Sequence, residues 1–238
     1  MGQRLFFVSE IRGGQAELHG EEAHHLTRVL RVQTGGQMEL SDSRQLVLAE
    51  VAEISKNHVR FRVIEERAAS PPVARVDLVA AIFKFDHFEW MLEKAVELGV
   101  SHVCPVFAEF TDRGLLAAAA KRRDRWTRIL KESSQQCRRW QLPALEEAHP
   151  LSRQLGREGR RLMLDESGGT PLLAALRDWA PGETVSLLTG PEGGWSPAER
   201  DAAVQAGWTR VSLGPTILRA ETAAIAGLAT VFQAALAR

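Results

Sequence analysis

The sequence has few cysteines and no long apolar run, and both absences limit the kind of protein that it encodes. Only Cys104 and Cys137 are present, far apart in the chain. A disulfide framework is therefore not expected, and no histidine spacing near them suits zinc. No stretch approaches the roughly 18 apolar residues of a membrane span, and the opening MGQRLFFVSE lacks the apolar segment of a signal peptide. We therefore expect a soluble, cytoplasmic protein with no metal and no membrane partner.

An excess of positive charge is also missing. The chain has 30 basic and 30 acidic residues, which counts against a nucleic-acid-binding protein. The basic residues are unevenly distributed, however, since 121–139 holds eight of them and only two acidic residues. This segment could contact the phosphates of a nucleic acid, but an ordinary solvated helix face explains it equally well.

The first part of the chain is rich in predicted strands. Short alternating or apolar segments indicate strands at 37–40, 45–51 and 59–64, with one helix over about 21–31. A small β-barrel is the expected result. The tandem prolines in 69–73 then predict an extended linker. Two domains are therefore expected, covering 1–70 and 71–238.

After the linker, strands alternate with helices, which predicts an α/β domain with a parallel sheet. Strands are expected at 76–83, 103–107 and 161–164, and a long basic helix over about 116–139. The helix between the first two strands should begin with Asp86 as its cap, have Glu89 three residues later, and end at Gly99. Its apolar stripe is interpreted as core.

The most informative stretch is 187–229, which reads LLTGPEGGWSPAERDAAVQAGWTRVSLGPTILRAETAAIAGLA. An apolar strand at 185–189 should be central in the sheet. A glycine loop follows, then a helix with a capping box of Ser196 and Glu199 that ends at Gly207. A strand at 209–213, a Gly-Pro loop and a helix opening near Arg219 repeat this arrangement. Because both loops follow parallel strands, a ligand crevice is expected between them.

A phosphate-bearing ligand fits this crevice poorly. Pro197 removes an amide donor, Glu192 and Glu199 add negative charge, and neither GxGxxG nor GxxxxGK[ST] is present. A cofactor with a positive centre, such as the sulfonium of S-adenosylmethionine, suits the loop better. An enzyme that uses a nucleotide nevertheless stays open as an alternative.

Two paired motifs carry a family resemblance. LTGPEGGWSPAE, followed by LGPTILRAETA, resembles the SPOUT superfamily of knotted methyltransferases, and within it the bacterial family that methylates N3 of a uridine in 16S ribosomal RNA. EKAVELGV at 93–100 and HHLTRVLR at 24–31 resemble the same family. The sequence departs from the family at Thr216, where members often carry arginine, and at 132–138, where ESSQQCR replaces the more usual EAAEQSxR.

The resemblance implies an α/β fold: a C-terminal SPOUT-like parallel sheet with a trefoil knot, plus a small N-terminal PUA-like β-barrel. It implies S-adenosylmethionine as the cofactor, 16S rRNA in the small ribosomal subunit as the partner, and a homodimer. The implied cofactor-binding residues are Thr189, Gly190, Glu192, Gly193, Gly194, Leu213, Gly214, Ile217 and Leu218. The implied RNA-binding residues are His25, Arg28, Arg31, Lys84, Arg113 and Arg138.

Two candidate catalytic residues lie at the start of the last helix. Arg219 is the candidate cation that stabilises charge developing on the uracil. Glu221 could orient it or act as a base, although an acid at this position more often only favours the helix dipole. The last helix, over 220–237, is apolar on nearly every face, which independently suggests a subunit partner. A different RNA methyltransferase of the same fold and a non-catalytic RNA-binding protein remain alternative functions.

Overall fold

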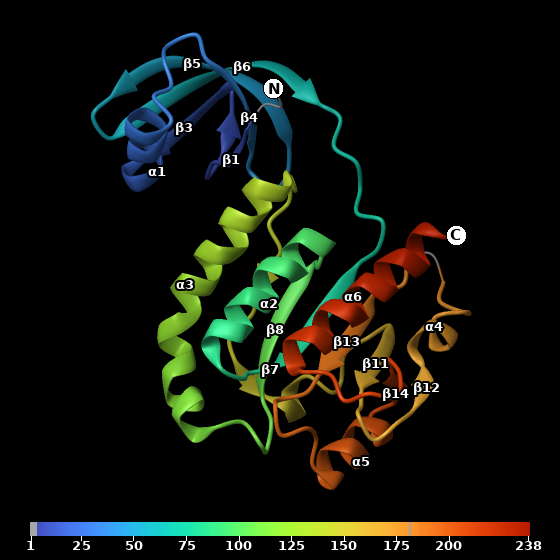
Figure 1. Cartoon of the computed structure of the whole chain (residues 1–238). Helices are drawn as coiled ribbons and strands as arrows, with labels where there is room; N and C mark the ends of the chain where they lie inside the picture. Colours follow the sequence, from blue (N-terminus) through green and yellow to red (C-terminus); the bar gives the residue numbers. More distant parts are fainter. Residues whose placement is uncertain (1–3, 181) are drawn as a thin grey trace. The chain divides into compact units, whose positions relative to one another are not determined.

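The computed structural model describes residues 4–180 and 182–238, which form two compact units (Figure 1). The N-terminal unit comprises Met1–Pro71 together with Lys131–Leu142. The C-terminal unit comprises Pro72–Leu130 and Pro143–Arg238. The long helix α3, Arg113–Cys137, therefore contributes its last residues to the N-terminal unit. The sequence predicted a single boundary at residue 70 and did not predict that a later segment joins the N-terminal unit.

The N-terminal unit is built on a six-stranded mixed sheet. The strand order is β1-β4-β5-β6-β3-β2, in which only the β1–β4 pair is parallel. The strands are β1 Leu5–Phe7, β2 Ile11–Arg12, β3 Gln15–His19, β4 Gln37–Ser41, β5 Leu46–Ser55 and β6 His58–Arg67. The last three confirm the predicted strands. The first three were missed, because they are short and two of them show no alternation of buried and exposed residues to identify them.

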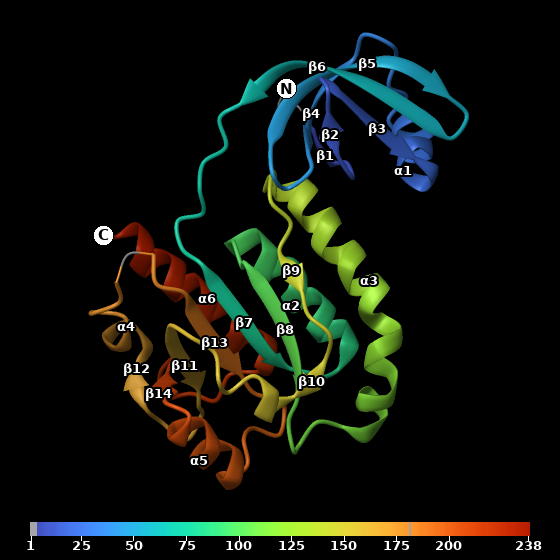
Figure 2. The same cartoon turned by 180° about the vertical axis from the view of Figure 1, so that it is seen from behind.

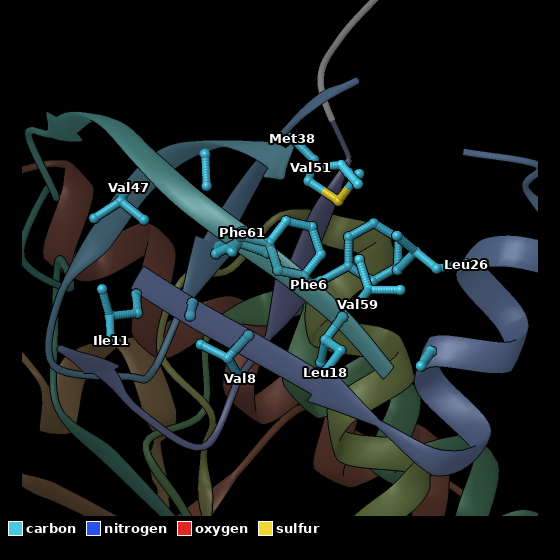
Figure 3. Close-up of a cluster of buried hydrophobic side chains, with 14 residues drawn as sticks. Phe6, Val8, Ile11, Leu18, Leu26, Met38, Val47, Val51, Val59 and Phe61 are labelled. Carbon is cyan, nitrogen blue, oxygen red and sulfur yellow. The ribbon is translucent and has the colours of Figure 1, made fainter. Parts of the chain in front are cut away.

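Alternate residues of these strands face one apolar core. Phe6, Leu18, Met38, Val59 and Phe61 are buried there, and Leu26 packs in from the helical segment (Figure 3). That segment consists of α1, Gly20–His24, and a π-helical turn η1, His25–Val29, where one helix was expected.

The segment Lys131–Leu142 is joined to the sheet by hydrogen bonds. The hydroxyl of Ser41 donates to the carbonyl of Trp140 at 2.5 Å, and the indole N–H of Trp140 donates to the carbonyl of Ser70 at 3.0 Å. The amide of Leu142 donates to the hydroxyl of Ser43 at 3.2 Å. These contacts explain why this later segment belongs to the N-terminal unit.

The C-terminal unit contains a parallel sheet, as predicted. The strand order is β10-β8-β7-β13-β11-β14-β12, and β9 pairs with β8 (Figure 2). The strands are β7 Val76–Ala81, β8 His102–Phe107, β9 Ala144–Leu145, β10 His149–Pro150, β11 Arg160–Leu164, β12 Thr170–Pro171, β13 Val185–Thr189 and β14 Thr209–Ser212. Every residue of β7 and β13 is buried, which confirms the central position predicted for the apolar strand at 185–189.

Helices cover the sheet. α2, Phe85–Leu98, packs beside α6, Ala220–Leu236, and α6 contacts β13 and β7 (Figure 1). Close packing of α6 depends on Gly227, because a Cβ there would lie 2.9 Å from Cδ2 of Leu187. α5, Pro197–Gln205, contributes Ala203 to a second cluster that also buries Trp195 and Trp208. The remaining helical segments are η2, Leu151–Arg153, and α4, Leu172–Ala175.

One predicted helix cap is confirmed and one is wrong. At α5 the amide of Glu199 donates to the Ser196 hydroxyl at 3.2 Å, and the amide of Ser196 donates to Glu199 Oε2 at 3.0 Å. At α2 the cap is Lys84, and Asp86 already lies within the first turn. Glu89 is not a capping residue, because it is buried against α3 by two arginines of that helix.

The Glu89 cluster also changes the interpretation of the basic helix. The Glu89 carboxylate accepts from Arg122 Nη1 at 3.2 Å and from Arg125 Nε at 2.7 Å. Arg122 also lies 4.7 Å above the ring of Phe85. Burial of a lone carboxylate is costly, so two guanidiniums are needed to compensate it. Part of the basic charge of α3 is therefore paired with a buried carboxylate, although both guanidiniums stay partly exposed.

Across the part of the chain that the structure describes, no helix is both long enough and apolar enough to span a membrane.

Candidate functional site

A cavity of about 460 Å³ lies at the carboxyl edge of the parallel sheet, within the C-terminal unit. Three loops form it, following β11, β13 and β14, and the first turns of α2 and α6 close it. Its lining residues are Lys84, His87, Leu164, Asp165, Glu166, Gly190, Pro191, Glu192, Gly194, Val211, Ser212, Leu213, Gly214, Thr216, Ile217, Leu218, Arg219, Ala220, Glu221 and Ala223. The predicted crevice between the two glycine loops thus exists, and a third loop was missed.

Most of the predicted cofactor-binding residues line this cavity, and two do not. The cavity is lined by Gly190, Glu192, Gly194, Leu213, Gly214, Ile217 and Leu218. Gly193 instead packs on Phe110, because a Cβ on Gly193 would lie 2.9 Å from the Cβ of that residue. Thr189 is buried at the end of β13, and its hydroxyl has no hydrogen-bond partner within the described residues.

The backbone of the GPEGG loop lies close to neighbouring side chains. Gly194 has φ +71, and a Cβ on it would lie 2.5 Å from Glu166 Oε1. A Cβ on Gly190 would lie 3.1 Å from the indole of Trp195, and that indole donates to the carbonyl of Leu164 at 2.9 Å. A side chain at Gly194 would collide with Glu166 in the loop that follows β11, and one at Gly190 would press on Trp195. Gly194 therefore allows two ligand-facing loops to lie against each other.

The acidic pair that follows β11 is neutralised by arginines. The buried carboxylate of Asp165 accepts from Nε of Arg200 at 3.0 Å and from Nε of Arg210 at 2.6 Å. Glu166 accepts from Arg200 Nη2 at 2.6 Å. Burial alone would raise the pKa of Asp165, but the Ser167 amide and the two guanidiniums outweigh burial and lower the pKa below its usual range. Asp165 is thus a structural anion in the wall of the cavity.

Sequence reasoning missed Asp165 and Glu166, although a signal for them was available. The two acids follow a buried strand directly and precede the turn of Ser167, Gly168 and Gly169. Polar residues at the carboxyl end of a parallel strand are the usual components of an α/β ligand site.

Two cations reach the cavity. Lys84 caps α2, and its Nζ lies 4.0 Å from Oε1 of Glu192. Arg219 caps α6 with extended backbone, and its side chain is exposed. No carboxylate within residues 4–180 and 182–238 forms an ion pair with Arg219. Its guanidinium is therefore available to a ligand.

Glu221 contacts an imidazole that the sequence reading had not singled out. Nδ1 of His87, in the first turn of α2, lies 3.2 Å from Oε1 of Glu221, in the first turn of α6. The Glu221 side chain is 9% exposed and that of His87 is 35% exposed. The two first turns therefore place a buried carboxylate behind a half-exposed imidazole at the cavity.

The predicted RNA-binding residues are distributed over both units. His25 and Arg28 lie exposed on η1. Arg31 and Arg138 are exposed and have positive φ of 51° and 59°. These four belong to the N-terminal unit, whereas Lys84 and Arg113 belong to the C-terminal unit.

A group of side chains able to ligate a metal lies outside the cavity, in the N-terminal unit. Nε2 of His19 and Nε2 of His58 lie 3.3 and 3.2 Å from one carboxylate oxygen of Glu17. The other oxygen of Glu17 lies 3.4 Å from Nε of Arg60. The carboxylate thus already has a cationic partner, and we interpret the group as a cross-strand polar cluster.

Comparison with known proteins now adds to this geometry. A family model described as an RNA methyltransferase domain matches residues 69–232, and one described as an RNA methyltransferase PUA domain matches residues 18–64. A ribosomal RNA small subunit methyltransferase E from Synechocystis is 32% identical over 242 residues, covering 97% of this chain and 77% of that protein.

Two solved structures are similar to this chain over nearly its whole length. The ribosomal RNA small subunit methyltransferase E of Neisseria gonorrhoeae, bound to S-adenosyl methionine, superposes with a TM-score of 0.86 at 26% identity, covering 96% of each chain. A structure from Legionella pneumophila in complex with the bound cofactor SAM has a TM-score of 0.86 at 29% identity, covering 99% of this chain and 98% of that one.

Fold, cavity and matches define an RNA methyltransferase with a PUA domain. More particularly, the chain belongs to the ribosomal RNA small subunit methyltransferase E family. The resemblance inferred from the paired loop motifs is thereby confirmed.

Proposed function

We propose that this protein transfers the methyl group of S-adenosylmethionine to N3 of a uridine in the 16S rRNA of the small ribosomal subunit. The observation that carries the proposal is the cavity at the carboxyl edge of the sheet, where three loops meet two helix starts in a chain of this family. Such a substrate would place the enzyme in the cytoplasm, where bacterial ribosomes are made.

The residues present fit the methyl donor. The volume of about 460 Å³ lies in the range of small-molecule pockets, roughly 300–1,000 Å³. Backbone from Gly190 and from the loop at Leu213 and Gly214 offers amides and carbonyls, and the buried hydroxyl of Thr189 lacks a partner within the described chain. Glu192 and Glu221 favour a positive centre over a phosphate. When bound, the donor supplies an electrophilic methyl group.

Arg219 is assigned the role of stabilising the charge that develops on the uracil. Deprotonated uracil spreads negative charge over N3 and its two carbonyl oxygens. A guanidinium held at a helix start, with no carboxylate partner among the described residues, can contact two of those acceptors. Lys84 lies on the same cavity and adds a second positive charge.

The N-terminal unit is assigned to RNA binding, as a PUA-like barrel. His25, Arg28 and Arg31 would contact RNA from η1 and its end, and Arg138 from the segment that returns to this unit. Arg113 would contact RNA from the start of α3. Each lost phosphate contact should reduce the salt dependence of RNA binding by about one unit of slope.

We also propose a homodimer that pairs through α6, and a trefoil knot at the cofactor loops. Ala226 and Thr230 of α6 are only partly buried within the chain, so a second subunit can cover them. Ala226→Glu should then give a monomer in sedimentation experiments, since the interface would bury an unpaired charge. A wild-type protein that is monomeric at micromolar concentration would contradict the dimer.

The test combines cofactor binding with mapping of the modified base. Calorimetry should show binding of S-adenosylmethionine that Gly214→Val weakens, because Gly214 lines the cavity at φ +140, where valine both strains the loop and adds a side chain to the cavity. Mass spectrometry of 16S rRNA from cells lacking the protein should show one missing methyl group, at N3 of a uridine.

Complementation of these cells separates catalysis from binding. Wild-type protein should restore the methyl group, whereas Arg219→Ala should lower turnover by roughly a hundredfold, the scale for loss of a preorganised charge-stabilising donor. Arg219→Lys should recover only part of this activity. Binding of ATP but not of the sulfonium donor by the wild-type protein would refute the proposed function.

A further inference from the structure

We propose that His87 accepts the N3 proton of the uracil and that Glu221 positions it for this step. This inference rests on the proposed function, because methylation at N3 requires loss of that proton. Among the described residues that line the cavity, His87 is the one imidazole. It is also the side chain that contacts the buried carboxylate of α6.

The arrangement of the two residues resembles that of a base and the group that orients it. α2 presents His87 from its first turn and α6 presents Glu221 from its first turn, and these helices pack against each other. The carboxylate lies 3.2 Å from Nδ1. A carboxylate beside Nδ1 stabilises the proton on that nitrogen and leaves the lone pair of Nε2 free to accept another. It also stabilises the imidazolium that forms after proton transfer.

The other ionisable side chains at the cavity are less suited to accept the proton. Lys84 and Arg219 are cations at neutral pH and suit charge stabilisation. Asp165 is enclosed by two guanidiniums and a backbone amide. Glu221 is almost fully buried, whereas the imidazole in front of it is partly exposed. His87 thus combines access with an orienting partner.

The step balances as follows. The N3–H bond breaks and its proton moves to Nε2 of His87. The electron pair left on N3 forms the bond to the methyl carbon, while the carbon–sulfur bond breaks and its electrons remain on sulfur. The imidazolium then releases its proton to solvent, which reaches the partly exposed His87 side chain. General base catalysis of this kind contributes typically about 10²–10⁴-fold to a rate.

Two carboxylates face the imidazole, one from each helix. Glu221 faces it from α6, and Asp86 of α2 places Oδ2 3.7 Å from Nε2. The exposed Asp86 therefore provides a matched control, since it is also a carboxylate near His87 but touches the other nitrogen from solvent. Lys84 and Glu192 line the same cavity, and no variant in the experiment below replaces them.

The experiment measures single-turnover methylation of rRNA with saturating RNA and cofactor across a pH series. His87→Gln should lower the rate by about 10²-fold or more and abolish the fall in rate toward acidic pH. Asp86→Asn should retain the wild-type rate and profile. Added imidazole should partly rescue His87→Ala. Calorimetry should show unchanged affinity of His87→Gln for S-adenosylmethionine, which separates the step from cofactor binding.

A readout independent of turnover tests the role of Glu221. Nitrogen NMR of the cofactor-free protein should show the His87 proton on Nδ1 in the wild type and a changed tautomer ratio in Glu221→Ala. An unchanged ratio would remove Glu221 from the pair. A His87→Gln enzyme with wild-type rate and pH profile would overturn the role of His87 alone. A wild-type protein that methylates no N3 position would overturn the proposed function, and this step with it.

Discussion

Replacing Asp165 with asparagine tests how the wall of the cavity is held together. The substitution keeps the shape of the side chain but removes the charge that two guanidiniums share. Breaking a buried ion pair by removing one partner typically costs about 3–5 kcal/mol. The cost should be smaller here, because Arg200 keeps Glu166 as a partner and Arg210 is 36% exposed and so partly solvated. The amide oxygen can also still accept one donor. We therefore expect a loss of about 2 kcal/mol in the free energy of unfolding.

Urea denaturation at neutral pH measures this loss, and Glu166→Gln is the matched control. Glu166 contacts the same Arg200 but is much more exposed than Asp165, so its loss should cost about 0.5 kcal/mol. The pKa of Asp165 is lowered in the folded protein, so its stabilisation is present above the unfolded value of about 3.9 and is lost as pH falls through the folded pKa. The gap between wild type and Asp165→Asn should accordingly close in acid. Equal losses in the two variants at neutral pH would refute this view of Asp165.

Three further substitutions probe the fold. Gly227→Ala should destabilise by about 1 kcal/mol in urea, despite the better helix propensity of alanine, because its Cβ would lie 2.9 Å from the side chain of Leu187; a gain in stability would show that α6 has room. Arg138→Gly should raise stability by about 0.5 kcal/mol in thermal denaturation, because glycine adopts φ 59° without strain; no change would mean that the turn relaxes. Asp77 raises the pKa of His102 by a hydrogen bond at 2.9 Å, so wild type should exceed His102→Asn in stability most below pH about 6.5 and lose that advantage as pH rises; a constant gap would contradict the pair.

The elements that the sequence predicted well are those determined by local signals. A capping box needs only Ser196 and Glu199 at the right spacing, and the structure forms both of its hydrogen bonds. The apolar strand at 185–189 is buried along its whole length. The helix predicted to open near Arg219 begins at Ala220. In each case either the interacting residues are close in sequence or a run of apolar residues directly indicates burial.

The failures concern residues whose partners are distant in sequence. Asp86 and Glu89 have the spacing of a capping box, but they do not form one. Glu89 accepts hydrogen bonds from Arg122 and Arg125, which come more than thirty positions later in the chain. The helix begins one residue before Asp86. Gly193 also has a neighbour that is distant in sequence, and its contact with the cofactor stays a prediction. A Cβ on Gly193 would lie 2.9 Å from the Cβ of Phe110, a contact that the sequence pattern did not indicate.

The carboxylates of the cavity show why a site can be located from sequence more readily than its chemistry. Asp165, Glu192 and Glu221 all follow strands of one sheet edge, so their gathering is predictable from the fold class. Their partners differ, and the partner determines what each can do. Two guanidiniums make Asp165 a structural anion. Lys84 lies 4.0 Å from the exposed Glu192, so a lysine and a carboxylate are paired at the mouth of the cavity. His87 beside Glu221 converts a carboxylate into the support of a proton acceptor. The chemistry of this edge is therefore specified by pairs of residues from different elements, and only the fold brings those pairs together.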